Sequence, residues 1–458
     1  MDENLNQDPQ NEIVEEAPRS FPIKKVISLV VGLIVILIII LIVVFVVIPR
    51  ISPKKQENVT LKYWLAWEDP APYKAIADEF TRKNPHIKVE VEKQDIKNLG
   101  KYIDRLKKRS DIGTGPDLYR FHNAWVTELI GLSLILPLPQ DVVSATELDS
   151  KFYPVVKNDL QVNGAYYGVP LQFDTLALFV NTQIFKENGI ETYPSTWEDL
   201  YPLALKLTVA DENGKITTSG IALGTYDNVS HAPDIVSLLL TQSGANPRKL
   251  NGEQQSSTDA FVFYTSFVNR EGAVWDSTME NSTLAFAKGN VAMFLGYSWN
   301  IFEIKAINPE LQFAILPAPY VAGGQPSTIA SYWVEGVSSK SKHPAEAFEF
   351  LKFLGSRQNM EKLYAQEAKT RLFGELYPRT DMADLLKSNT LIYPFVSQGK
   401  NAVSTIFSSN TYDDAMVDQL NTYMGDAIRA ITNDGTSPQT AVDTLSQGVA
   451  EVIGKYAK

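Results

Sequence analysis

The chain has 458 residues, a formal charge of −11, no cysteine and four histidines. With 44% hydrophobic and 21% charged residues it can bury a large core, and at roughly 150 residues per domain its length suggests about three domains. The absence of cysteine excludes disulfides, thiolate metal sites and cysteine nucleophiles, and an acidic chain without a grouped basic cluster argues against nucleic acid as a partner.

The N-terminal segment contains a long apolar run. Residues 1–22 are acidic, rich in Asn and Gln and without apolar periodicity, so we expect a disordered tail. An uncharged run of 23 residues then extends from Val26 to Ile48, and as a helix it spans roughly 35 Å, enough for a bilayer core of about 30 Å. The alternative is a cleavable signal peptide, whose apolar region is about 7–15 residues long and ends at small residues. No such site follows this run, so we predict an uncleaved transmembrane anchor over residues 23–49.

Charges on the two sides of the apolar run are nearly balanced, and the positive-inside count slightly disfavours a cytoplasmic N-terminus. The rule is weak before a long translocated domain, so other evidence decides the orientation. The basic residues concerned are Arg19, Lys24 and Lys25 before the run and Arg50, Lys54, Lys55 and Lys62 after it. Residues 50–58 are predicted to form a short linker. The body from residue 59 to residue 458 has ordinary globular composition without a visible repeat.

Strand and helix patterns alternate along the body. Period-two or apolar runs predict strands at 59–64, 86–91 and from 117, whereas helical spacing predicts helices at 73–83, 99–109 and 344–354. A capping box at 195–198, led by Ser195, predicts a further helix that ends at Leu207. This alternation indicates an α/β architecture with mostly parallel sheets.

Local catalytic signatures are missing from the sequence. The histidines at 86, 122, 231 and 343 are too far apart for a zinc-binding helix. There is no nucleophile elbow and no Walker A loop, and residues 113–116 lack the third glycine of a dinucleotide fingerprint. We therefore predict no catalytic residue, metal or cofactor, although two dispersed carboxylates can form a glycosidase pair without a local motif.

The order of motifs along the body resembles that of a known family. The motifs are 61–68 (LKYWLAWE), 80–85 (FTRKNP), 115–118 (GPDL), 136–138 (LPL), 164–170 (GAYYGVP), 178–181 (LFVN), 194–200 (PSTWEDL), 286–293 (FAKGNVAM) and 315–319 (ILPAP). Gly296 with Trp299 and a tail helix at 441–453 complete the series. In this order they are similar to the extracytoplasmic solute-binding proteins of ABC importers, specifically the sugar-binding group that includes maltose-binding proteins.

This resemblance implies a periplasmic-binding-protein-like fold of two α/β lobes, joined by a hinge and closing on a ligand between them. We expect residues 59–170 and 318–355 in lobe I, and residues 171–317 and 356–458 in lobe II. The body is then extracytoplasmic and the tail cytoplasmic. The apolar helix replaces the lipidated N-terminal cysteine of most relatives, and the expected partners are a mono- or oligosaccharide and ABC permease subunits.

The resemblance also indicates ligand-binding positions, where flat aromatics and polar partners suit sugar rings and hydroxyls. The eight candidates are Trp67, Glu68, Phe121, Asn123, Asp174, Trp299, Trp333 and Glu335. Each aromatic candidate can alternatively be a core residue, and His122 is interpreted as a structural histidine. The adjacent tyrosines at 166 and 167 resemble a feature of iron-binding relatives, but their sequence context favours a structural role.

Three functions remain open at this point. The first is a membrane-anchored receptor that delivers a carbohydrate to an ABC importer. The second is a binding module that feeds a membrane sensor or chemotaxis-type receptor. The third is a glycoside hydrolase that uses Asp174 or Glu335.

Overall fold

A computed structural model describes residues 23–47, 57–94, 101–268, 272–413 and 415–456, and divides the chain into two units, Met1–Glu57 and Asn58–Lys458. The expected tail at 1–22, the end of the apolar run at Ile48 and most of the linker at 50–58 lie outside the described residues. So does the start of the helix expected at 99–109.

The first unit contains the apolar helix. It is α-helical over α1 (Ile23–Ile42) and continues as a π-helical turn, η1 (Val43–Val47). The stretch Val26–Phe45 is long and apolar enough to cross a membrane, and none of it is buried.

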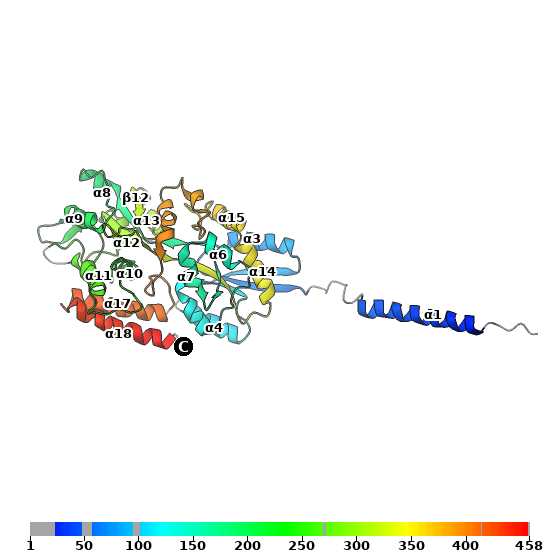
Figure 1. The fold of residues 1–458 in the computed structure, drawn as a ribbon. Helices are drawn as coiled ribbons and strands as arrows, with labels where there is room; N and C mark the ends of the chain where they lie inside the picture. Colours follow the sequence, from blue (N-terminus) through cyan, green and yellow to red (C-terminus); the bar gives the residue numbers. More distant parts are fainter. Residues whose placement is uncertain (1–22, 48–56, 95–100, 269–271, 414, 457–458) are drawn as a thin grey trace, which may run out of the picture. The chain divides into compact units, whose positions relative to one another are not determined.

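The second unit is built around two sheets (Figure 1). The first has the order β2 (Ile87–Lys93), β1 (Val59–Leu65), β3 (Leu118–His122), β14 (Trp333–Val337) and β6 (Val169–Pro170). Strand β1 is parallel to β2 and β3, whereas β14 is antiparallel to β3 and β6. Helices α3 (Pro70–Lys83) and α14 (Pro344–Leu354) pack against it through Phe80 and Phe350, and Phe350 also contacts Tyr63 of β1.

The second sheet has the order β11 (Met293–Gly296), β8 (Ala177–Asn181) and β12 (Phe313–Pro317). Both outer strands are antiparallel to β8. Phe179 at its centre contacts Phe286, Phe294 and Phe313, so aromatic packing forms the core here. A third, small sheet pairs β13 (Thr328–Ser331) with β7 (Asp174–Thr175) and β15 (Ala402–Val403).

The other described elements surround these sheets. Helix α4 (Tyr102–Asp111) lies between β2 and β3 in the chain. The helices between β3 and β12 are η3 (Asn123–Trp125), α5 (Val126–Gly131), α6 (Ala145–Lys151), α7 (Pro154–Leu160), α8 (Thr182–Glu187), α9 (Trp197–Leu207), α10 (Ala232–Gln242), α11 (Gln255–Ser266), α12 (Ser282–Ala287) and α13 (Asn300–Ile307). The later ones are α15 (Arg357–Glu367), η4 (Ala383–Leu386), α16 (Tyr393–Ser397), η5 (Gly399–Asn401), α17 (Met416–Thr432) and α18 (Pro438–Tyr456), and two short hairpins pair β4 (Gln161–Val162) with β5 (Ala165–Tyr166) and β9 (Val209–Ala210) with β10 (Ile216–Thr218). Helices α17 and α18 lie side by side (Figure 1).

Two local expectations need correction. The cap of α9 is Thr196 and not Ser195: the Thr196 hydroxyl accepts from the Asp199 amide at 3.2 Å and donates to the Asp199 carboxylate at 2.8 Å. The expectation of mostly parallel sheets is also wrong. The chain leaves the first sheet after β6 and returns to it only at β14, which therefore enters in the opposite direction, and every pairing described in the second sheet is antiparallel. The helix at Pro344–Leu354 is confirmed with the expected bounds.

Candidate functional site

A cavity lies between the two main sheets and offers about 330 Å³ to the centres of water-sized molecules. Its aromatic lining residues are Trp67, Phe173, Trp299, Phe302, Trp333, Phe373 and Tyr412. Its ionisable lining residues are Asp174, Glu303, Arg371 and Glu375. Because the lining comes from both sheets and from the loops after α15 and β15, the cavity is enclosed by segments that are far apart in sequence.

The wall on the side of the first sheet is a cluster of indole rings. Trp67 directly follows β1 and meets Trp333, the first residue of β14, edge to face with 4.4 Å between ring centroids. Trp333 also contacts Trp125 at 5.3 Å and the His122 ring at 5.1 Å. Trp333 is only 6% exposed, so it is at once a core residue and a cavity residue. This packing fixes the wall before any ligand arrives.

The opposite wall carries Trp299, which precedes α13. Its ring stacks on Tyr297 with a centroid distance of 4.4 Å and an interplanar angle of 12°. Nearby, Phe302 stacks on Phe373 at 4.4 Å and 28°. Ring faces held in this way suit ligands with flat apolar faces, and sugar rings have such faces.

Asp174 is the most deeply buried acid in the lining. One carboxylate oxygen accepts from the Ser298 amide at 2.9 Å and the Ser298 hydroxyl at 2.6 Å, and the other accepts from the Thr175 amide at 2.8 Å. Burial nevertheless dominates and raises the pKa of Asp174 to about 8, against the lowering effect of these hydrogen bonds. At neutral pH the group therefore keeps its proton, and a protonated carboxyl can donate to a ligand hydroxyl as well as accept from one.

An arginine cluster that our reading of the sequence missed borders the same cavity. Arg371 Nη2 donates to Glu367 at 2.7 Å and to Glu375 at 2.8 Å, and its guanidinium lies 5.5 Å from the centre of the Phe302 ring. Burial, with the charge of Glu375, raises the pKa of Glu367 to about 7. The four-residue spacing from Glu367 to Arg371 and on to Glu375 was visible in the sequence and is the signal that points to this cluster.

Four of the eight predicted residues line the cavity: Trp67, Asp174, Trp299 and Trp333. Their contact with a ligand stays a prediction. The other four, Glu68, Phe121, Asn123 and Glu335, are buried but are not among its lining residues.

Glu68 and Glu335 have another partner. Both carboxylates pair with Arg120 of β3, whose side chain is fully buried, and Tyr73 accepts a further hydrogen bond from the guanidinium at 3.1 Å. Two buried acids thus compensate one buried cation. Glu68 and Glu335 are therefore close in sequence to the cavity residues Trp67 and Trp333, but their carboxylates pair with the buried Arg120.

Phe121 and Asn123 are also occupied elsewhere. Side chains alternate along a strand, so Phe121 lies on the face of β3 opposite to Arg120 and His122, where its ring packs close to Gly168 and Gly336. Gly168 has φ +85°, and an added Cβ would lie 2.5 Å from a Val334 methyl, so only glycine fits there. The Asn123 amide donates to Asp159 at 3.0 Å and accepts from the Tyr332 amide at 3.2 Å.

The sequence predicts structural roles for His122 and for the adjacent tyrosines at 166 and 167. His122 accepts from the Ala124 amide through Nδ1 at 3.2 Å and bonds Ser331 through Nε2 at 3.0 Å, and burial lowers its pKa to about 3. It is thus a neutral, satisfied histidine. The Tyr166 hydroxyl donates to Asp149.

A cavity walled by aromatic side chains, lined by residues of the first sheet and by residues beside the second, is the arrangement of a two-lobe solute-binding protein. The sequence profile of the bacterial extracellular solute-binding proteins matches residues 66–361, and the chain belongs to this family. Members of the family are binding proteins and not enzymes.

Individual relatives agree with this assignment. An uncharacterised ABC-transporter extracellular-binding protein of Pyrococcus horikoshii is 25% identical over 401 residues, covering 80% of this chain and 85% of that protein. The multiple sugar-binding protein of Streptococcus mutans is 24% identical over 331 residues, covering 69% and 75%. Among solved structures, the sugar-binding protein MalE of Xanthomonas citri superposes with a TM-score of 0.70 at 20% identity, over 87% of this chain and 98% of that one. It supports the fold.

Proposed function

We propose that this protein binds a carbohydrate outside the cytoplasmic membrane and delivers it to an ABC-type importer. The observation that carries the proposal is the cavity itself, which Trp67, Trp299 and Trp333 line together with Asp174. Aromatic faces and a hydrogen-bonding carboxyl are complementary to the two kinds of surface that a sugar presents. The sugar-binding relatives support this choice of ligand class.

Ligand delivery in this proposal uses closure of the two lobes, 59–170 with 318–355 and 171–317 with 356–458. Support comes from the cavity lining, which combines residues of the first sheet with residues beside the second. A ligand that contacts both walls binds the closed arrangement more tightly than the open one, and this difference in affinity stabilises the closed arrangement. The permease then distinguishes a closed, loaded protein from an open one.

The proposal includes a single-pass membrane anchor formed by the apolar helix, with the C-terminal body extracytoplasmic. Support comes from the length and complete exposure of Val26–Phe45. The alternative, a signal sequence removed on export, makes a different prediction for the mature protein. Membrane fractions should contain a protein whose intact mass includes residues 23–49; a soluble protein that starts after this segment would contradict the anchor.

Calorimetric titration of the purified full chain with neutral mono- and oligosaccharides tests the binding function. We expect saturable heat with at least one sugar and no product by chromatography after prolonged incubation. Steady turnover would contradict a binding protein. Absence of binding across the sugar panel, together with saturable binding of another polar solute, would contradict the carbohydrate assignment while leaving the family intact.

A further inference from the structure

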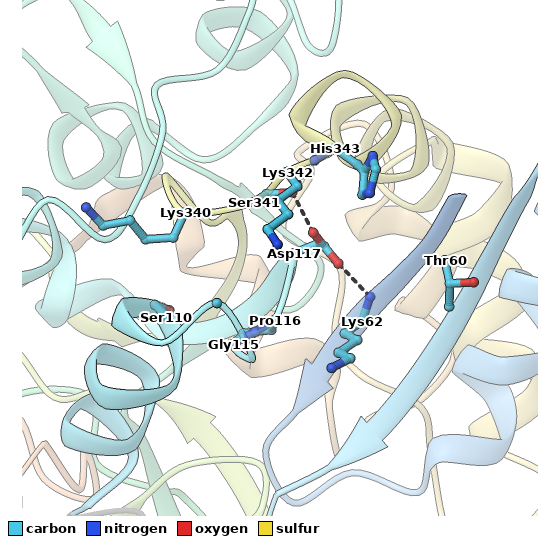
Figure 2. A pocket seen from close by; sticks show the side chains of 11 residues that line it. Thr60, Lys62, Ser110, Gly115, Pro116, Asp117, Lys340, Ser341, Lys342 and His343 are labelled. Atoms are coloured by element: carbon cyan, nitrogen blue, oxygen red, sulfur yellow. Dashed lines mark hydrogen bonds between the residues drawn. The ribbon is translucent and has the colours of Figure 1, made fainter. Parts of the chain in front are cut away.

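A second, smaller pocket lies at the other end of the strands that carry the aromatic cavity (Figure 2). It offers about 160 Å³ and is polar. Lys62 comes from β1, Ser110 from the end of α4, Asp117 from the residue before β3, and Lys340 and Lys342 from the loop between β14 and α14. Trp67 and Trp333 are at the opposite ends of β1 and β14, so this pocket is separate from the cavity already described.

The charges around this pocket are unbalanced. Three lysines, Lys62, Lys340 and Lys342, line it together with one acid, Asp117. Both Asp117 oxygens are in use, because one accepts from the Lys62 backbone amide at 2.9 Å and the other from the Ser341 hydroxyl at 2.5 Å (Figure 2).

None of the three ammonium groups forms a salt bridge or a side-chain hydrogen bond with a described residue. The acid opposite Lys62 across the strands is Glu90, and Glu90 pairs with Lys88 at 2.6 Å. Three lysines therefore line the pocket with one acid, and Glu90, whose pKa is lowered by Lys88 and in part by the charge of Lys62, offsets part of this excess of positive charge.

Hydrogen-bond donors accompany the charge. The Ser110 hydroxyl is buried without a partner, although its residue lines the pocket. Gly115 packs directly against this hydroxyl, because a Cβ at that position would lie 2.6 Å from the hydroxyl oxygen. Helix α14, 11 residues long, begins beside the pocket at Pro344, which has no amide hydrogen, and carries Glu346 in its first turn. Only the amides of Ala345 and Glu346 are free to favour an oxyanion there, so the helix N-terminus adds little to the lysines.

We propose that this pocket binds a phosphate group. Lysine ammonium groups bind phosphate as point charges, and the three lysines that line this small polar pocket, together with the unpaired Ser110 hydroxyl, suit a compact, multiply charged oxyanion. The pocket lacks the apolar walls that a sugar or an aromatic ligand would need. Asp117 lines the same pocket, and its two hydrogen bonds, to the Lys62 amide and the Ser341 hydroxyl, fix the loop that carries Lys340 and Lys342.

The phosphate has two possible sources, a free anion and the headgroup of an anionic lipid. The lipid source rests on the proposed membrane anchor. Strand β1 begins at Val59, 12 residues after Val47, and 12 extended residues reach at most about 43 Å. A headgroup bound in this pocket would hold this end of the body at the membrane surface and so orient the cavity relative to the permease.

The test uses the full chain in nanodiscs of neutral phosphatidylcholine, titrated with inorganic phosphate or with chloride at equal ionic strength. We expect phosphate to raise the midpoint of thermal unfolding more than chloride does, because binding to the native state alone stabilises it. Lys340→Gln/Lys342→Gln should weaken phosphate affinity at least tenfold. The control Lys387→Gln/Lys400→Gln changes the net charge equally, at two exposed lysines outside the pocket, and should leave the affinity unchanged.

A second arm replaces part of the neutral lipid by phosphatidylglycerol. The chain contains no cysteine, so a single fluorophore can be placed by Ile112→Cys, at a side chain that is 74% exposed near the pocket. Quenching by labelled lipid that increases with phosphatidylglycerol, and falls in Lys340→Gln/Lys342→Gln, assigns the phosphate to the lipid. A response to inorganic phosphate alone assigns it to the free anion.

Equal responses to phosphate and chloride, or equal responses of the pocket variant and the control variant, overturn the proposal. Sugar binding measured on the same two variants separates this outcome from a failure of the proposed function. Both variants should bind sugar as the parent chain does, whether or not the pocket binds phosphate.

Discussion

Arg120 and Glu335 are opposite each other on the antiparallel strands β3 and β14, with Nη2 of the arginine 2.5 Å from Oε1 of the glutamate. Both side chains are completely buried. Glu68, from the loop after β1, pairs with the same guanidinium. The Arg120 guanidinium thus joins β3, β14 and the loop after β1. Burial raises the pKa of Glu335 to about 6, although the charge of Arg120 and the hydrogen bonds to Glu335 lower it.

Replacing Arg120 should destabilise the protein strongly. Arg120→Met leaves Glu68 and Glu335 buried without a cation, and loss of one partner in such a cluster costs about 3–5 kcal/mol. Urea unfolding followed by tryptophan fluorescence measures the effect. Arg429→Met is the matched control: Arg429 pairs with Asp227 and Asp426, both of which are largely exposed, and should change the free energy of unfolding by less than about 1 kcal/mol. Equal effects of the two substitutions would contradict the structural role of Arg120.

Trp299→Ala should weaken sugar binding at least tenfold, which corresponds to about 1.4 kcal/mol. The substitution removes a ring held by stacking on Tyr297, and with it one flat wall of the cavity. Calorimetric titration gives the affinity, and Tyr193→Ala, at a 39% exposed tyrosine outside the cavity, is the control. Unchanged affinity in Trp299→Ala would remove this residue from the proposed site.

Asp174 should make stability depend on pH in a definite direction. Its native pKa of about 8 exceeds the value of about 3.9 expected in the unfolded chain. Between these values the native state keeps a proton that the unfolded state has lost, so stability falls as pH rises, by at most about 1.4 kcal/mol per pH unit.

Asp174→Asn removes this contribution, so the difference in unfolding free energy between parent and variant should change steadily from about pH 4 to about pH 8. Urea unfolding at several pH values measures it. The exposed Asp211 provides the control Asp211→Asn. A difference that stays constant across the window would show that Asp174 ionises normally.

Gln398 joins the two segments that pass between the sheets. Its amide nitrogen donates to the Thr175 hydroxyl and the Leu176 carbonyl, each at 2.9 Å, and its oxygen accepts from the Ala318 amide at 3.0 Å. Gln398→Leu leaves the Ala318 amide unpaired and should cost about 1–3 kcal/mol. Because Thr175 adjoins Asp174, we also expect weaker sugar binding.

Urea unfolding and calorimetry on the same samples test both parts of this prediction. Gln183→Leu removes an amide that is exposed and bonds only Glu187, and should stay within about 0.5 kcal/mol of the parent. If Gln398→Leu behaves like this control, the three hydrogen bonds do not hold the crossing segments together.

The sequence pattern predicts a helix or strand well where the element buries one face, because the apolar residues then recur at a regular spacing. The apolar spacing that predicted helix 344–354 and the alternation that predicted the first two strands depend on neighbours in sequence. Strand direction does not. Whether β14 runs parallel or antiparallel to β3 depends on how often the chain has crossed between the sheets, and no local pattern records that.

The same distinction divides the predicted site. Trp67 and Trp299 follow strand ends, where loops carry functional side chains, and both line the cavity. Glu68 and Glu335 looked equally suitable, but their role is decided by Arg120, which is 52 residues from the first and 215 from the second. The sequence contains the buried arginine without any sign that β14 returns beside it.

The separation of Arg120 from Glu335 also matters during synthesis. Synthesis proceeds from the N-terminus, so Arg120 and the first three strands of the first sheet leave the ribosome long before residue 335 exists. Until then the first sheet lacks β14, and Arg120 lacks one of its two carboxylates and stays hydrated. Co-translational folding of the N-terminal half therefore stops at an open, incomplete sheet, and a chain terminated before β14 would expose both an unpaired strand edge and a cation that only later residues can cover.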